Sequence, residues 1–357
     1  MKELLSFYSG KRVFVTGYTG FKGAWLCRIL VDAGAEVTGY ALLPNTEPNL
    51  YHLANLEGSM NSIIGDVRDF SHLQRVFQQT RPEIVFHLAA QPIVRAGYQD
   101  PVGTYGTNVM GTVHILECVR QSDTVRSMVN VTTDKVYQNK EWVWGYRESD
   151  RLDGFDPYSN SKSCSELVSG CYVRSFFADA QIPLCTMRAG NVIGGGDFAP
   201  DRILPDCIRS AISGEKIFLR NPFSVRPYQH VLEPLMAYLL VAKRQMEDAH
   251  IAGSYNIGPD VCDCITTGAL ADLFCEAWGE NISWTHNCER NAPHEASCLR
   301  LDHMKIKETL GWSPRWHVDT AVEKTVAWVK AWLQGENIAA VMREQIKSYA
   351  EVVEHVG

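Results

Sequence analysis

The residues best suited to chemistry are a tyrosine and a lysine four positions apart. Tyr158 and Lys162 belong to the segment Tyr-Ser-Asn-Ser-Lys, and on a helix this spacing places both side chains on one face. A lysine ammonium beside a phenol favours the phenolate, which lowers the pKa of the tyrosine and lets it act as a base near neutral pH. The pair predicts removal of a proton from an alcohol while a hydride leaves the same carbon.

A second group of acid and base residues precedes this pair by a little over twenty positions. Thr132, Thr133, Asp134 and Lys135 follow directly after an apolar run. A carboxylic acid and a second amine are more than a plain alcohol oxidation needs, so we predict oxidation plus a further proton-transfer step. A solvated turn after a strand is the alternative, although ligands bind at this edge of parallel sheets.

Strands and helices alternate along the first half of the chain, and they must position these residues. The predicted strands cover 11–16, 36–41, 61–64, 83–88, 127–131 and 183–187, and the predicted helices cover 24–33, 71–79, 102–121, 158–178 and 320–353. Strand and helix in strict turn indicate an α/β fold, a Rossmann-type doubly wound parallel sheet with helices on both faces. In the last helix, Trp328, Val329 and Trp332 are expected to pack.

The pattern changes after about residue 188, where glycine-rich and proline-containing loops interrupt irregular segments. No flexible linker separates the two parts, so we expect a second, smaller domain packed on the first. The expected division is a dinucleotide-binding domain of 1–187 with about 225–252, and a mixed α/β substrate domain of 188–224 with 253–357.

Composition excludes several classes of protein. At 357 residues, with 45% hydrophobic and 21% charged residues, the chain has the make-up of an ordinary globular protein. The net charge of −7 gives no reason to expect nucleic acid or an anionic membrane as a partner. The N-terminus does not resemble a signal peptide and no run is long enough to span a bilayer, so we expect a cytoplasmic protein.

The cysteines predict reduced thiols rather than disulfides or a metal site. There are eleven, an odd number, and they are scattered through apolar segments. Cys262 and Cys264 are separated by one residue rather than the roughly two to four usual at zinc sites. The other candidates form a loose cluster without a Cys-x-x-Cys pair: His286, Cys288, His294 and Cys298. We therefore expect no metal.

A glycine-rich loop follows the first predicted strand and opens the first predicted helix. Gly17, Gly20 and Gly23 suit a tight turn, close backbone approach to a pyrophosphate and close packing of helix on strand. An ordinary strand–helix turn is the alternative. Tyr18 is bulky for this loop, so we expect it to reduce the room for the pyrophosphate and NAD to bind only moderately.

The end of the second predicted strand lacks the usual reader of the adenosine ribose. Leu42 and Leu43 stand where an acid would indicate NAD and an arginine would indicate NADP. Residue types at this position therefore do not separate the two cofactors. Asp66 is placed either to receive the adenine amino group or to cap a turn.

Several motifs together resemble the extended short-chain dehydrogenase/reductase superfamily. They are the glycine loop, Gly65-Asp66-Val67, His87-Leu88-Ala89-Ala90-Gln91, Asn108 and the Tyr158/Lys162 pair. Thr133-Asp134 resembles the nucleotide-sugar 4,6-dehydratases of that superfamily. Five further segments resemble the CDP-glucose 4,6-dehydratase branch. They are Thr16-Gly17-Tyr18-Thr19-Gly20-Phe21-Lys22-Gly23, Thr46-Glu47-Pro48, Asp134-Lys135-Val136-Tyr137, Arg226-Pro227-Tyr228-Gln229-His230 and Pro293-His294-Glu295-Ala296.

The resemblance implies a lyase that converts CDP-glucose to CDP-4-keto-6-deoxyglucose and water, with NAD as cofactor. It implies deoxysugar biosynthesis of the O-antigen type, for lipopolysaccharide, and a homodimer or a tetramer. Thr133 and Tyr158 would hold the sugar 4-hydroxyl, Tyr158 taking its proton. Lys162 would bind the nicotinamide ribose, and Asp134 would protonate the departing 6-hydroxyl.

Lys135 departs from the pattern of the thymidine-linked dehydratases, which usually have glutamate there. The resemblance implies that it removes the C5 proton. A neighbouring carboxylate raises the pKa of an amine, so Lys135 could instead stabilise the enolate electrostatically. The sequence leaves both roles open.

The resemblance also implies binding residues. Cofactor positions are Gly17, Gly20, Phe21, Lys22, Gly23, Asp66, Val67, Leu88, Ala89, Ala90, Asn108, Tyr158 and Lys162, and substrate positions are Gln91, Asn191, Arg202, Arg226 and His294. A guanidinium suits a diphosphate, although either arginine could lie on the surface. We expect His87 to be structural, and Trp142 and Trp144 to pack a loop near the site.

Two other functions compete with a dehydratase. A nucleotide-sugar 4-epimerase on the same scaffold would be expected to have small residues in place of Asp134 and Lys135. A non-catalytic dinucleotide-binding sensor would not need Thr133, Tyr158 and Lys162 together.

Overall fold

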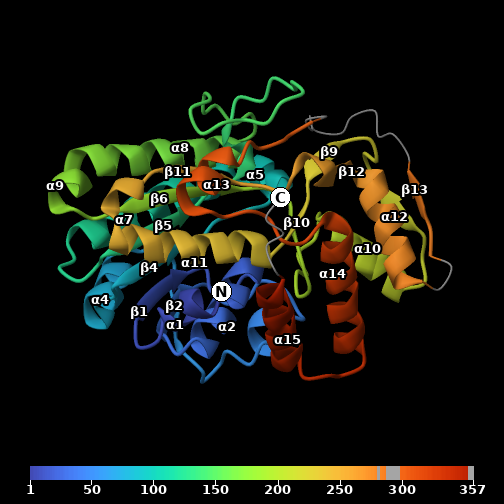
Figure 1. Cartoon of the computed structure of the whole chain (residues 1–357), viewed down its shortest axis with the longest axis horizontal. Coiled ribbons are helices and arrows are strands. Elements are labelled where there is room, and N and C mark those ends of the chain that lie inside the picture. Colours follow the sequence, from blue (N-terminus) through green and yellow to red (C-terminus); the bar gives the residue numbers. More distant parts are fainter. Residues whose placement is uncertain (280–281, 287–297, 353–357) are drawn as a thin grey trace.

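A seven-stranded parallel sheet forms the centre of the molecule in a computed structural model that describes residues 1–279, 282–286 and 298–352 (Figure 1). The strand order is β11-β6-β5-β4-β1-β2-β3. The strands are β1 (Arg12–Thr16), β2 (Glu36–Ala41), β3 (Asn61–Ile64), β4 (Ile84–His87), β5 (Ser127–Val131), β6 (Leu184–Ala189) and β11 (Ser254–Ile257). Every pairing in this sheet is parallel, which confirms the predicted Rossmann-type architecture.

Helices cover both faces of the sheet because its central strands are apolar on both sides. Val13 and Val15 of β1 belong to a core shared with α2 (Phe21–Asp32) and α11 (Leu232–Glu247). Phe14 between them belongs to a second core, shared with α4 (Phe70–Thr80) and α7 (Gly111–Arg120). Successive side chains of a strand point to opposite faces, so such continuous apolar runs suit a sheet buried on both sides.

The remaining helices connect the strands or build the region beyond the sheet. They are α1 (Lys2–Ser6), α3 (Leu50–Leu53), α5 (Val94–Gln99), α6 (Pro101–Tyr105), α8 (Pro157–Tyr172), α9 (Ala178–Ala180), α10 (Ile203–Ile212), α12 (Thr267–Trp278), α13 (Met304–Leu310), α14 (Val318–Leu333) and α15 (Ile338–Glu351). Two π-helical turns, η1 (Gly106–Met110) and η3 (Val173–Phe177), extend α6 and α8. Short 3₁₀ turns are η2 (Asp134–Val136), η4 (Ala249–Ile251) and η5 (Val261–Asp263).

Several segments after β6 form a second region beside the sheet, on the right of Figure 1, whereas α11 and β11 belong to the sheet and its covering layer. Its short strands are β7 (Val192–Ile193), β8 (Ile217–Leu219), β9 (Val225–Pro227), β10 (Gln229–His230), β12 (Cys264–Thr266) and β13 (Trp284–His286), which form two-stranded pairs. The helices α10, α12 and α14 pack around them. This region places the loops after β6 over the carboxyl ends of the parallel strands.

Most predicted strands and helices agree with the structure to within a few residues, but some elements were not predicted, among them α10, α11, α12 and α13, and some predicted helices are interrupted. The strand β11, at the edge of the sheet, was not predicted, and it lies beyond the boundary expected near residue 252. The helix predicted over 102–121 contains the π-helical turn η1 between α6 and α7. The predicted C-terminal helix is divided into α14 and α15 by a turn at Gly335. The φ of +74° there lies in the left-handed region, which glycine adopts without steric cost. Trp328 and Val329 are buried as expected.

No helix in the described part of the chain combines the length and apolar character needed to cross a membrane.

Candidate active site

A large cavity opens at the carboxyl ends of β1, β4 and β5, beneath the loops of the second region. Its volume is about 1740 Å³, above the roughly 300–1,000 Å³ typical of a site for one small molecule. The sheet and its connecting loops contribute the glycine loop, the end of β5 and the start of α8. The second region contributes residues from 189 to 226. The cavity therefore has room for a dinucleotide and a second ligand side by side.

The glycine loop has the geometry that its spacing predicted. Gly17 has a φ of +75°, and a Cβ there would lie 2.7 Å from the backbone nitrogen of Ala89. A Cβ on Gly23 would lie 2.1 Å from the carbonyl oxygen of Gly17, so helix and loop touch at this point. Gly20 lines the cavity and meets nothing closer than 3.5 Å, which leaves its surface open to a ligand. The helix α2 that follows has no side-chain cap at its N-terminus, a favourable place for a phosphate.

Tyr18 does not narrow this loop, contrary to the expectation from its size. The side chain is fully buried and turned into the core, where its ring packs edge-on against Tyr51 with centroids 5.3 Å apart. Gly39 makes this possible, since a Cβ there would lie 2.5 Å from the Tyr18 ring. The pyrophosphate side of the loop is therefore formed by backbone, not by the phenol.

At the adenosine end, Asp66 is held by its neighbour Arg68. Its carboxylate accepts hydrogen bonds from the Arg68 backbone nitrogen at 2.9 Å and from Nη2 at 2.6 Å. These hydrogen bonds lower the pKa of Asp66. Asp66 thus shapes a turn while also lining the cavity, so both alternatives drawn from the sequence are compatible with its position. Leu42 and Leu43 line the same end and are largely exposed.

Tyr158 and Lys162 both line the cavity from the first two turns of α8. The expected lowering of the Tyr158 pKa is not found. Burial raises it to about 12, with a hydrogen bond to Thr133 acting in the opposite direction. Lys162 Nζ donates to the carbonyl oxygen of Val131 at 2.9 Å, and burial lowers its pKa to about 8. Desolvation of both groups outweighs the effect of their proximity.

Asp134 is buried at the end of β5 with half of its carboxylate unused. Thr133 Oγ1 donates to Oδ1 at 2.9 Å. Oδ2 has no hydrogen-bond partner among the described residues, although the residue is only 1% exposed and lines the cavity. Gly190 provides the space for this oxygen, since a Cβ there would lie 2.0 Å from Oδ2. A buried unpaired acid in a cavity indicates a ligand hydroxyl or water as its partner.

Lys135 continues the same 3₁₀ turn and is half-buried at the cavity wall. Its backbone nitrogen donates to Thr133 Oγ1 at 3.4 Å, which caps the turn. Within the described ranges, no carboxylate lies within ion-pair distance of its amine. The amine therefore stays available to a ligand.

Asn108 and Gln91 support the cavity without lining it, as far as the described residues show. Asn108 Oδ1 accepts from the Gln91 backbone nitrogen at 2.8 Å, and its Nδ2 donates to Ser161 Oγ at 2.9 Å. The Gln91 amide bonds Thr104 at 2.9 Å and the Ile93 backbone nitrogen at 2.6 Å. Both side chains are thus used inside the fold, fixing the loop after β4 against α8.

The substrate positions drawn from the resemblance fall into three groups. Asn191 and Arg226 line the cavity and come from the second region. Arg202 also lines it, and its Nη1 bonds Asp197 at 3.2 Å. His294 lies outside the described residues. The two arginines therefore both face the cavity rather than the open surface.

Positive charge gathers around the glycine loop. Burial, together with the charges of Arg202 and Lys162, lowers the pKa of Lys22 to about 7. Lys22 Nζ lies 3.5 Å from the hydroxyl of Tyr238. Several cations close together in a cavity favour an anionic ligand such as a diphosphate.

His87 is structural, as predicted. It is 1% exposed, and its ring nitrogens lie 2.8 Å from Thr16 Oγ1 and 3.4 Å from Thr112 Oγ1. Burial lowers its pKa to about 3. Trp142 packs against Tyr146 in the loop after η2, with centroids 5.3 Å apart, as expected, but Trp144 is exposed and its predicted packing is wrong.

Sequence reasoning missed a buried network beneath η2, the turn that carries Asp134. Glu166 on α8 and Arg188 on β6 form an ion pair of 2.9 Å, with both side chains almost fully buried. Arg188 also donates to the hydroxyl of Tyr137 at 2.8 Å. The signal for Glu166 was its place four residues after Lys162, on the same helical face. No local sequence pattern points to Arg188, because it contacts Glu166 only once β6 packs against α8 in the fold.

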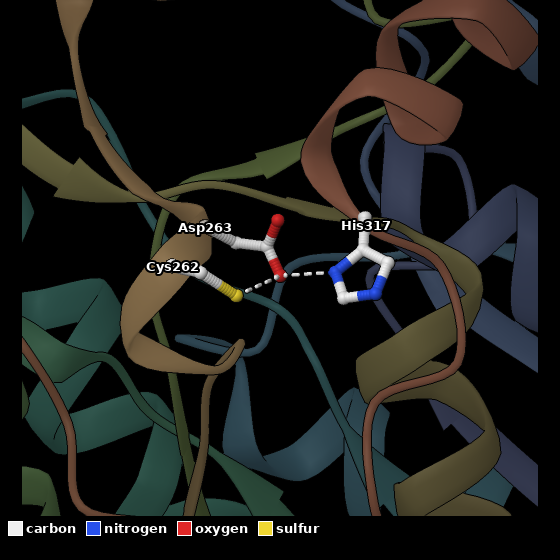
Figure 2. A group of neighbouring side chains, drawn as sticks. All are labelled: Cys262, Asp263 and His317. Carbon is white, nitrogen blue, oxygen red and sulfur yellow. Dashed lines mark hydrogen bonds and ion pairs between the residues drawn. The ribbon is translucent and has the colours of Figure 1, made fainter. Parts of the chain in front are cut away.

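Cys262, Asp263 and His317 form a separate group outside the cavity, and their donor atoms lie within 4.8 Å of one another (Figure 2). His317 Nδ1 donates to Asp263 Oδ2 at 2.9 Å, and the Val318 backbone nitrogen donates to Oδ1 at 3.0 Å. Asp263 raises the pKa of His317. These contacts join η5 to the start of α14, so a role in the fold accounts for the group.

The fold and this cavity define a dinucleotide-dependent enzyme of the short-chain dehydrogenase/reductase type. The sequence model of the GDP-mannose 4,6 dehydratase family matches residues 14–325, and the chain belongs to this family. The chain is 48% identical over 350 residues to the CDP-glucose 4,6-dehydratase of Salmonella typhimurium, covering 96% of this chain and 97% of the relative. A dTDP-glucose 4,6-dehydratase of Xanthomonas campestris is 27% identical, with 90% and 94% covered.

Solved structures support the same fold. A UDP-glucose 4-epimerase from Thermotoga maritima has a TM-score of 0.77 at 23% identity, covering 90% of this chain and 99% of that one. A dTDP-glucose 4,6-dehydratase from Bacillus anthracis, solved in complex with NAD, has a TM-score of 0.73 at 20% identity, covering 92% and 99%. At these identities the likeness concerns architecture, so the choice between epimerase and dehydratase depends on the site.

Proposed function

We propose that this chain is a CDP-glucose 4,6-dehydratase, a lyase that forms CDP-4-keto-6-deoxyglucose and water. The observation that carries the proposal is Asp134: a buried acid with one unpaired oxygen in the cavity, close to Tyr158 and Thr133. Oxidation at C4 alone does not need such an acid, whereas loss of a hydroxyl does. The 48% identity to a CDP-glucose 4,6-dehydratase supports the same reaction.

The cavity fits NAD as the cofactor. Gly17, Gly20 and the uncapped N-terminus of α2 form a cradle for the pyrophosphate. Leu42 and Leu43 offer no charge to a 2′-phosphate, and Arg68 is already paired with Asp66, so the adenosine end favours NAD over NADP. Bound there, NAD would supply a hydride acceptor at C4 and, in its reduced form, a hydride donor for C6.

Tyr158 is the base that takes the proton from the 4-hydroxyl. Burial raises its pKa, so the phenolate form has to be stabilised by positive charge nearby. Lys162 supplies part of that charge and holds the nicotinamide ribose. Thr133, which is bonded to Asp134, orients the same hydroxyl.

Asp134 and Lys135 carry out the elimination. A C4 ketone makes the C5 proton acidic, and Lys135 faces the cavity without a fixed ion pair in the described ranges, as a C5 base requires. Asp134 donates its proton to the departing 6-hydroxyl through Oδ2. The two residues are adjacent on η2, so one turn presents acid and base to neighbouring carbons of the sugar.

The second region holds the nucleotide. We propose that 188–224 and 253–357 form the substrate domain, with Arg202 and Asn191 from it, and Arg226 from the adjoining segment 225–252, facing the CDP diphosphate and sugar. We also propose a homodimer, formed through α6, η1 and α8.

The reaction is tested by incubating the protein with NAD and CDP-glucose in deuterated water. Product should have lost water and carry solvent deuterium at C5, and NADH should not accumulate in proportion to product. UDP-, dTDP- and GDP-glucose in parallel test the base specificity. A C4 epimer formed without loss of water would overturn the proposal in favour of an epimerase.

A further inference from the structure

A buried carboxylate one helical turn beyond Lys162 has no part in the steps above. Glu166 is 4% exposed and is surrounded by donors. Its Oε1 accepts from Thr132 Oγ1 at 2.5 Å, and its Oε2 accepts from Thr186 Oγ1 at 2.7 Å and from Arg188 Nη2 at 2.9 Å. One side chain of α8 thus holds the end of β5 to the neighbouring strand β6.

Arg188, the ion-pair partner of Glu166, contacts the residue that follows η2. Arg188 Nη1 donates to the hydroxyl of Tyr137 at 2.8 Å, and its guanidinium carbon lies 5.1 Å from the centre of that ring. The Tyr137 hydroxyl donates to Asn256 Oδ1 at 2.6 Å. Because Thr132 precedes η2 and Tyr137 follows it, the ion pair fixes the turn that carries Asp134 at both ends.

Glu166 also acts on Lys162. The two residues are four apart on α8, and Lys162 donates to Val131, next to Thr132. Burial disfavours the ammonium form of Lys162, and the Glu166 charge opposes this effect. Other titratable or charged groups near these two residues, among those that the structure describes, include Tyr158 on α8, Lys22 on α2, His87 on β4, Asp134 and Lys135 on η2, Arg188 on β6 and Arg202 before α10.

We propose that Glu166 is a positioning residue of the catalytic centre, which holds the Thr133–Asp134 turn through Thr132 and places a negative charge one helical turn from Lys162. The inference rests on the proposed function only in supposing that Tyr158 and Lys162 carry out C4 oxidation. An epimerase would need the same step.

The test is the pH dependence of kcat/KM, whose alkaline limb reports loss of the Lys162 ammonium in the free enzyme. Glu166→Gln removes the charge but leaves Arg188 buried and unpaired, which can prevent folding. The double variant Glu166→Gln/Arg188→Met therefore removes both charges at similar volume. The matched control is Glu233→Gln, which neutralises another fully buried carboxylate, on α11.

We expect the alkaline limb of the Glu166 variants to move to lower pH by about one unit or more, the effect of losing a nearby opposite charge. Activity well above the limb should fall about tenfold or more, while Glu233→Gln keeps the wild-type profile. A folded double variant with the wild-type limb would overturn the proposal, as would an equal shift in Glu233→Gln. Failure of the wild type to oxidise CDP-glucose would count against the proposed function instead, and the profiles would then use the nucleotide-glucose that it does oxidise.

Discussion

Asp134 is the residue whose surroundings distinguish oxidation alone from oxidation with loss of water. Thr133 occupies one of its oxygens, and the backbone at Gly190 leaves the other facing the cavity. A satisfied carboxylate would be a structural group, whereas this one lacks a partner within the described chain. Its chemistry can therefore be separated experimentally from that of Tyr158.

Asp134→Asn should slow the elimination far more than C4 oxidation. An amide cannot donate a proton to the leaving hydroxyl, and loss of general-acid catalysis costs about 10²–10⁴-fold. The variant should therefore stall with reduced cofactor bound, visible as absorbance of the reduced nicotinamide after mixing with CDP-glucose. Asp263→Asn, which removes a buried charge outside the cavity, is the control. Near-normal turnover of Asp134→Asn would remove Asp134 from the mechanism.

Gly190→Ala should reproduce part of that defect without changing a catalytic residue. The new methyl group would lie 2.0 Å from Asp134 Oδ2, so the carboxylate must move. We expect turnover to fall at least about tenfold, since small misplacements of reacting groups are costly, with reduced cofactor accumulating as above. Gly253→Ala is the control, because its Cβ would meet only the flexible end of Lys305 at 3.5 Å. Equal activities of the two variants would contradict this account.

At the residue scale, the sequence predicted which side chains line the cavity better than which ones only support its walls. Thr133, Asp134, Tyr158 and Lys162 come from two short motifs, and strand ends of a parallel sheet bring them together. The orientation of Gln91 follows from contacts with residues distant in sequence, which residue types do not reveal. The same limit applies to the Tyr158 pKa, because burial depends on the whole cavity.

The elements show where local patterns suffice. Most of the first six strands are short, largely apolar runs between turn residues, so their bounds could be predicted closely, although β3 is only partly buried. The strand β11 is a four-residue segment after an irregular stretch, and it becomes a strand by pairing with β6. The π-helical turn η1 is equally invisible, since it lies within a continuous helical pattern.

The helix α11 provides a pH-dependent link between elements. Glu233 is fully buried and accepts hydrogen bonds from the Trp316 backbone nitrogen at 2.8 Å and from the hydroxyl of Tyr349 on α15 at 2.7 Å. Burial raises the pKa of Glu233 from 4.5 to about 7. The native state therefore binds more protons than the unfolded chain between these values, and stability falls as the pH rises through this window.

Glu233→Gln should flatten that part of the stability profile. The component that disappears is at most about 3 kcal/mol, since each pKa unit corresponds to about 1.4 kcal/mol. Urea midpoints measured at intervals from below 4.5 to above 7 compare the variant with the wild type. Glu344→Gln, at an exposed position of α15, should keep the wild-type slope. A wild type whose stability rises steadily through the window would show that Glu233 does not dominate it.

At the scale of the whole molecule, α8 lines the cavity with its first turns and carries an exposed apolar side chain further along. Exposed apolar side chains gather on α6, η1, α8 and η3, which pack together: Val102, Met110, Leu167 and Phe176. Val102 is 83% exposed and Leu167 59%. We expect exposed apolar side chains on neighbouring elements to contribute to a protein interface, in which a second copy of the chain would cover them by twofold symmetry.

The final prediction is that this surface forms the dimer. Val102→Glu/Leu167→Glu should shift the protein toward monomer. Dimer formation would bury two carboxylates of each chain against those of the other chain, at a cost of several kcal/mol. Sedimentation velocity over a concentration series measures the change. Val143→Glu is the matched control, since Val143 is 69% exposed on a different loop and should leave the dimer intact.

Because the start of α8 carries Tyr158 and Lys162, the dimer would also stiffen the helix that holds the catalytic pair, and the monomeric variant should lose activity along with its partner. A wild type that sediments as a monomer at micromolar concentration would rule out this arrangement, and dissociation by Val143→Glu alone would place the interface elsewhere.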